Sequence, residues 1–139
     1  MASMAAYPFI QSSMDPGEIL LDYDKLADLA DVFEPVEFPR MLMMAELNVV
    51  ALLDQIDASI KCAEPRSAGK FVHTLGGLLG TYGMKTAARC VCQIETGIEE
   101  LSEARLQEFV VLVNQSLEAY RAFRCRAEYA ISGHAAITG

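Results

Sequence analysis

Apolar residues recur at spacings of three and four along most of this sequence, and that periodicity limits the fold more than any other feature. Between Asp22 and Phe33, for example, Leu26, Leu29 and Ala30 fall at helical spacing. The strict alternation and the β-branched runs typical of strands are nearly absent. The pattern therefore predicts an all-α protein.

Prolines, glycines and capping residues divide this pattern into five helices. A short helix covers 22–33 and ends before Pro35, and a long apolar helix begins near Glu37 and runs to about residue 62. Three further helices are expected at about 66–82, 84–98 and 102–131, with Gly83 ending the first of them and Ser102 capping the last. Short connections make consecutive helices antiparallel. We therefore expect an antiparallel up-down four-helix bundle with a short additional N-terminal helix.

Length, charge and hydropathy restrict the class of protein. The 139 residues, 53% of them hydrophobic, suffice for one domain, which we place at 19–139 after a leader at 1–18 that is poorly ordered or left by cloning. No segment has the length of a membrane span or the pattern of a secretion signal, so a soluble, cytoplasmic protein without membrane insertion is expected. The formal charge of −8 argues against a nucleic-acid partner.

Methionines and cysteines are both interpreted as core residues. An adaptable binding groove is the alternative for Met41, Met43 and Met44, but methionine fills a bundle core more simply. The apolar residues that accompany them in the second helix are Leu42, Leu47, Val50, Leu52, Leu53, Ile56 and Ile60. The cysteines lack metal-ligand spacing and are predicted to be interior thiols: Cys62, Cys90, Cys92 and Cys125.

The helix predicted at 66–82 carries a histidine on its outer face. At about 100° per residue, its large apolar side chains form a core-facing stripe roughly 120° wide, and His73 lies about 160° from the centre of that stripe. The stripe comprises Phe71, Val72, Leu75, Leu78, Leu79 and Tyr82. The same outer face is predicted to hold four glycines, although glycine is unfavourable inside a helix: Gly69, Gly76, Gly77 and Gly80.

These surroundings suggest that His73 is reached by another protein. Glycine removes side chains that would block approach to an imidazole. Lys70 and Arg66 lie one and two turns before His73. This otherwise acidic protein therefore presents positive charge beside His73, and such charge suits a phosphoryl group. A solvated helix face remains the simpler interpretation of the two basic residues alone. His134, in a Gly- and Ala-rich tail, has no comparable neighbours.

The run from His73 to Gly83, His-Thr-Leu-Gly-Gly-Leu-Leu-Gly-Thr-Tyr-Gly, resembles the signature of histidine phosphotransfer (HPt) domains. Leu75, Gly77 and Gly83 match that signature in order. The likeness extends over roughly 22–131 in the order and length of the helices, and includes a cysteine and an acid on the following helix, Cys90 and Glu95. Two positions depart from the family pattern: Gly76 replaces a usual lysine, and Leu78 replaces a small residue.

The resemblance implies a phosphorelay intermediate of a two-component system. His73 would accept a phosphoryl group from an aspartate of a receiver domain, in a response regulator or hybrid sensor kinase, and pass it to another receiver. Such a protein is a carrier in signal transduction rather than an enzyme with turnover. It needs no cofactor of its own, because Mg²⁺ is expected on the receiver. Lys70, Arg66, Gly76 and Gly77 would surround the phosphoryl group, and Gly69, Gly80 and Thr74 would contact the partner.

Two other functions are consistent with parts of the sequence. An HPt-like adaptor that sequesters a receiver or another regulator without being phosphorylated is suggested by the missing lysine, for which Lys70 would otherwise substitute. A four-helix metalloprotein is less consistent with the sequence, because Glu-x-x-His pairs are absent and only two histidines exist. No metal site is predicted.

Overall fold

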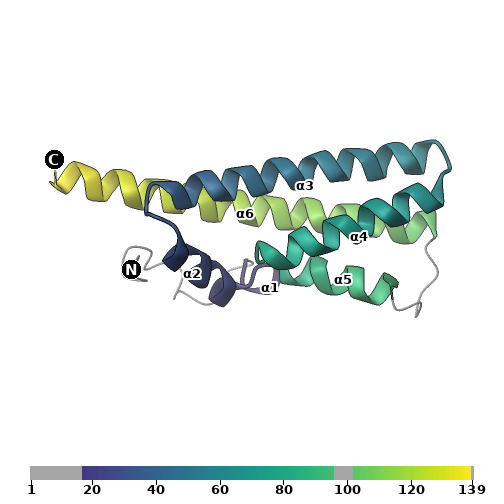
Figure 1. Cartoon of the computed structure of the whole chain (residues 1–139), viewed down its shortest axis with the longest axis horizontal. Helices are drawn as coiled ribbons and strands as arrows, with labels where there is room; N and C mark the ends of the chain where they lie inside the picture. The colour runs from purple at the N-terminus through teal and green to yellow at the C-terminus, as the bar shows by residue number, and fades with distance from the viewer. Residues whose placement is uncertain (1–16, 96–101, 139) are drawn as a thin grey trace.

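The computed structural model describes residues 17–95 and 102–138, and the described elements are all helical (Figure 1). The all-α prediction is confirmed for these residues. The elements are α1 (Gly17–Leu20), α2 (Tyr23–Val32), α3 (Glu37–Lys61), α4 (Pro65–Thr81), α5 (Lys85–Glu95) and α6 (Glu103–Thr138).

Helices α3 to α6 run alternately in opposite directions along the molecule (Figure 1). Helix α3 packs against α4 and α6, while α5 packs against α4 and α6 from the other side. Their facing sides supply a continuous apolar core, whose largest fully buried side chains include Tyr120, Phe38, Phe109, Phe123 and Leu75. The helices are thus held together by burial of one stripe from each.

Local sequence signals set several helix ends, and the signals at Gly83 and Ser102 act as predicted. The Asp22 side chain accepts a hydrogen bond from the backbone amide of Lys25 at 3.1 Å and caps α2. The hydroxyl of Ser102 accepts one from the amide of Arg105, also at 3.1 Å, and caps α6. Gly83 has a φ of +84°, the left-handed conformation that lets the chain reverse between α4 and α5.

Helix α6 ends later than predicted, and two other predicted boundaries lie at or beyond the limits of the described residues. Helix α1 lies across the predicted leader boundary at residue 18, and residues 1–16 of that leader are outside the described residues. Helix α6 continues to Thr138 instead of ending near Ile131. Two alanines after Gly133 favour this continuation, because alanine has the highest helix propensity. The predicted end of the preceding helix at Ile98 lies outside the described residues, in which α5 ends at Glu95.

The prediction that the α3 methionines fill the core is wrong for Met43 and Met44. Both are exposed, and so is Leu47, whereas Met41 is partly buried. Helix α3 already buries Leu42 and the residues in register with it, and the exposed residues lie on its opposite face. Hydrophobicity alone did not distinguish the two faces, because α3 carries apolar residues on both.

The cysteine prediction is also largely wrong. Cys90 is buried, but Cys62, Cys92 and Cys125 are exposed, and all four are free thiols. Cys90 and Cys92 belong to opposite faces of α5, as two positions about 200° apart on a helix must.

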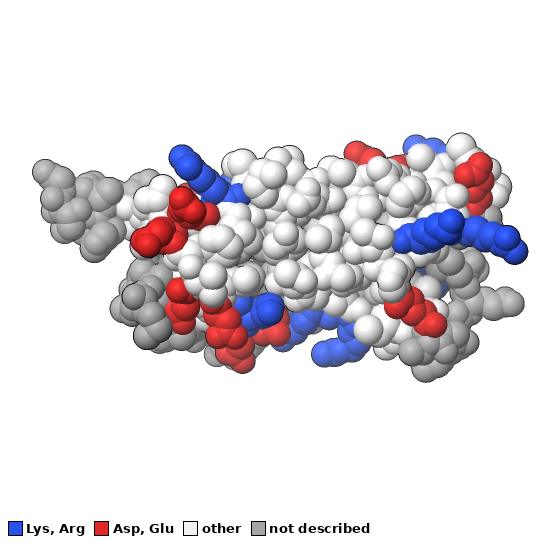
Figure 2. Space-filling view, viewed as in Figure 1, with Lys and Arg blue, Asp and Glu red and all other residues white. Residues whose placement is uncertain are grey.

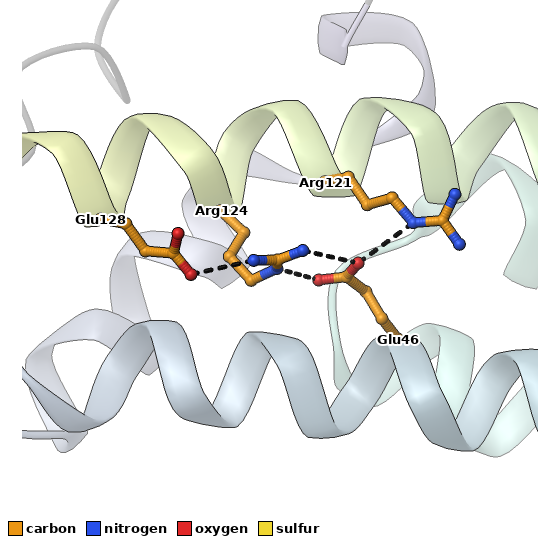
Figure 3. Close-up of polar contacts among 4 residues, drawn as sticks. All are labelled: Glu46, Arg121, Arg124 and Glu128. Carbon is orange, nitrogen blue, oxygen red and sulfur yellow. Dashed lines mark hydrogen bonds and ion pairs between the residues drawn. The ribbon is translucent and has the colours of Figure 1, made fainter.

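An ion-pair cluster centred on the buried Glu46 joins α3 to α6 (Figure 3). The carboxylate of Glu46 accepts hydrogen bonds from Arg124 and, at 3.3 Å, from Nε of Arg121. Nη1 of Arg124 also donates to Glu128 at 2.9 Å. Glu46 is buried, and its hydrogen bond raises the pKa of Arg124 above the usual range. An acid placed in the core is tolerated here because two guanidinium groups reach it.

Within residues 17–95 and 102–138, no helix combines the length and the apolar character needed to cross a membrane.

Candidate functional site

His73 lies in the middle of α4 and projects into solvent. Pro65 occupies the first turn of this helix, where a missing amide is harmless. Ala68, Val72 and Leu75 follow at helical spacing and are buried. This stripe fixes the rotation of α4, so the side chain of His73 points outward with 78% of its surface exposed. The predicted position of the histidine is confirmed.

The imidazole of His73 is oriented by a carboxylate from the next helix. Its Nδ1 atom lies 2.7 Å from Oε1 of Glu95, at the end of α5. An ionised carboxylate can only accept a hydrogen bond, so Nδ1 must carry the proton. In the neutral ring, Nε2 then holds the free lone pair. The pair therefore fixes which nitrogen of His73 is available as a nucleophile.

The four α4 glycines do not share one environment. Gly77 and Gly80 are exposed, and a Cβ atom added to either would meet nothing within 4 Å. The prediction that all four lie on the open face is wrong for Gly76, whose added Cβ would lie 2.6 Å from Cγ1 of Val91 on α5. Gly69 is partly buried. Two glycines thus clear the approach to His73, while Gly76 permits close packing of α4 on α5.

Basic and hydroxyl side chains complete this face of α4. Lys70 and Arg66 are exposed, as predicted, and neither forms an ion pair within the described part of the chain. Their charges are therefore available to an approaching anion. Thr74 is exposed, but its hydroxyl donates to the carbonyl oxygen of Lys70 at 3.2 Å. Its side chain is thus engaged with its own helix.

From the sequence, Glu95 is predicted only as part of a family resemblance and without a role. A signal for its contact was present in the chain. His73 lies ten residues before the reversal at Gly83, and Glu95 lies twelve residues after it. Residues at similar distances from a tight reversal lie at the same level of an antiparallel helix pair, and the packing of the two helices decides whether their side chains meet.

Neither a metal centre nor an enclosed cleft is associated with His73. No group of three or more His, Cys, Asp or Glu side chains suited to hold a metal occurs within residues 17–95 and 102–138. A cleft of about 340 Å³ lies between the α3–α4 turn and the start of α6, lined in part by Ser59, Glu64 and Glu103. The histidine instead stands on an open helical surface, which suits contact with a macromolecule.

Comparisons with known proteins give no relative for this chain. No protein-family model matches it, and neither curated protein sequences nor solved structures give a significant match.

Proposed function

We propose that this chain is a histidine phosphotransfer protein whose helices α3 to α6 form the four-helix bundle of an HPt domain. The observation that carries the proposal is that His73 is exposed and that its Nδ1 atom is hydrogen-bonded to Glu95. The combination of an oriented ring, open approach and unpaired positive charge suits a phosphoryl acceptor in a cytoplasmic phosphorelay.

The reaction is the transfer of one phosphoryl group from an aspartyl phosphate to the unphosphorylated side chain of His73. The Nε2 lone pair of His73 attacks the phosphorus of an aspartyl phosphate on a receiver domain. The N–P bond forms while the acyl P–O bond breaks, and the receiver aspartate leaves as a carboxylate. Positive charge that develops on the ring is stabilised by Glu95 through Nδ1–H. Mg²⁺ held by the receiver would neutralise charge on the phosphoryl oxygens, and His73 would carry the phosphoryl group between receivers.

The surroundings of His73 support docking of a partner on α4. Gly77 lies one turn after His73 and Gly80 about two turns after, both without side chains that would obstruct a receiver. Lys70 lies about one turn before it, and Arg66 about two. Their positive charges favour the phosphoryl oxygens as these approach.

Transfer of a radioactive phosphoryl group tests the proposal. The purified chain is incubated with phosphorylated receiver domains, and the label is examined for lability in acid and stability in base, as expected of a phosphohistidine. His73→Gln should abolish the label, and His134→Gln, at the only other histidine, should retain it. Failure of every receiver to label the protein, or retention of label in H73Q, would contradict the proposed function.

The packing of Gly76 favours a second candidate function. The Cβ atom of a lysine at this position would clash with Val91. The lysine that the HPt signature usually carries therefore does not fit at residue 76. An adaptor that binds a receiver without accepting its phosphoryl group is consistent with this. Receiver binding that H73Q leaves unchanged, together with no label on the wild-type protein, would favour the adaptor.

A further inference from the structure

The outer face of α3 carries an apolar stripe that covers nothing within the described residues. Met44 and Leu47 lie on it with 57% and 56% of their surface exposed. Alternating spacings of four and three continue the stripe in both directions, as in the seam of a coiled coil. Its members, all exposed, are Arg40, Met44, Leu47, Ala51, Asp54 and Ala58. Helix α3 therefore has an exposed, partly apolar face in addition to its core face.

This outer stripe has one charge on each side of its centre. Arg40 lies seven residues before Leu47 and Asp54 lies seven residues after it, which is about 10 Å along the helix axis in each direction. Neither forms an ion pair within the described part of the chain. Between them the stripe is apolar. Figure 2 shows charged side chains at the two ends and along the upper and lower edges of this view, and an uncharged middle over α3 and α4.

We propose that two copies of this chain associate through their α3 helices, antiparallel and related by a two-fold axis near Leu47. In that arrangement Arg40 of each copy faces Asp54 of the other, so the contact contains two opposite-charge pairs. A parallel arrangement would set arginine against arginine and aspartate against aspartate. The chain itself carries a base and an acid at this spacing on an apolar stripe, so a second copy is the partner that fits.

Association through α3 leaves the candidate phosphoryl acceptor free. His73 projects from α4 and bonds to Glu95 on α5, and α4 lies between α5 and α3 (Figure 1). Each dimer would therefore present two accessible histidines. This inference does not rest on the proposed function, because it uses only the exposed residues of α3.

Sedimentation equilibrium of the full chain over a range of concentrations tests the dimer. The monomer mass is 15.2 kDa, so a concentration-dependent rise toward twice that value is expected. Leu47→Glu should weaken association at least tenfold. Val111→Glu is the matched control on α6, where valine is also 56% exposed, and should leave association unchanged. Circular dichroism checks that both variants keep their helices.

Charge reversal gives a second test that does not depend on the apolar stripe. Arg40→Asp alone and Asp54→Arg alone each set like charges against one another and should weaken the dimer. The double variant R40D/D54R restores opposite pairs and should recover association. A protein that stays monomeric at concentrations up to about 0.5 mM overturns the proposal. Equal weakening of association by L47E and V111E also overturns it, and so does a double variant whose dimer is no tighter than those of the single variants.

Discussion

Gly76 on α4 and Val91 on α5 approach so closely that no side chain fits between the helices. A Cβ atom at residue 76 would lie 2.6 Å from Cγ1 of Val91 and 3.2 Å from its Cβ. Valine is stiff in a helix, because its branched Cβ allows one main rotamer, and so it cannot turn aside cheaply. This contact sets the distance between the helix that carries His73 and the helix that carries Glu95.

Alanine substitutions should therefore have opposite effects at neighbouring glycines. Gly76→Ala is expected to destabilise the fold by about 1–3 kcal/mol through overpacking. Gly77→Ala, which meets open space, should stabilise it by up to about 1 kcal/mol through improved helix propensity. Urea unfolding of both variants measures the difference. Equal effects would show that α4 and α5 are not in close contact at this point.

Removal of the Glu95 carboxylate should slow phosphorylation of His73. Glu95→Ala releases Nδ1 and is expected to reduce the rate of transfer by on the order of tenfold, equivalent to about 1.4 kcal/mol. Glu103→Ala, at an exposed acid on α6, is the control. Nitrogen NMR of the imidazole provides a readout independent of transfer, because the proton should leave Nδ1 in E95A. An unchanged tautomer would contradict the role assigned to this hydrogen bond.

Lys70 is expected to replace the lysine that Gly76 cannot provide. Lys70→Ala should slow phosphorylation of His73 severalfold, because a positive charge close to the phosphoryl oxygens is lost. Lys61→Ala removes a lysine at the end of α3 and should leave the rate unchanged. Stopped-flow transfer from a phosphorylated receiver measures both. An unaltered rate in K70A would show that Lys70 does not take the place of the missing lysine.

The cluster centred on Glu46 should be asymmetric in its contribution to stability. Glu46→Ala leaves Arg124 without its main partner in a largely buried position, and we expect a loss of about 2–4 kcal/mol. Arg121→Ala removes a half-exposed partner and should cost less than about 1 kcal/mol. Denaturant unfolding compares them. A larger loss in R121A than in E46A would contradict the burial-based ranking.

Tyr120 should make the fold sensitive to alkaline pH. Burial, followed by the nearby charge of Glu46 and by Tyr82, raises the pKa of its hydroxyl above the usual value. Above about pH 10 the unfolded chain loses this proton while the folded chain keeps it, so stability falls as pH rises; below that pH the group contributes no such dependence.

Replacing Tyr120 by phenylalanine isolates the contribution of its hydroxyl to stability. The buried Tyr120 hydroxyl has no hydrogen-bond partner among the described residues, so Tyr120→Phe should also stabilise the fold at neutral pH by about 1 kcal/mol. The difference from wild type should widen above pH 10. Tyr129→Phe, at an exposed tyrosine, should show neither effect. Thermal unfolding between pH 7 and about 11 tests the prediction; a constant difference across that range would disprove the pH dependence.

The sequence predicted the helices well because their signals are local. Periodic apolar residues, the caps at Asp22 and Ser102, and the glycine at residue 83 each act within a few residues of the chain. The outward direction of His73 followed from the same periodicity, since the buried stripe of α4 determines its opposite face. The predicted end of α6 was less accurate, because a glycine such as Gly133 can lie inside a helix as well as end one.

The sequence by itself therefore determined the all-α class, most of the helix positions and the outward direction of the histidine. Only the tertiary structure decided which apolar face of α3 is buried, which glycine packs against Val91, and which acids meet His73, Arg121 and Arg124. Each of these depends on a contact between different helices. Hydrophobic periodicity orients a helix toward a core, but the choice of partner across that core requires the arrangement of all the helices.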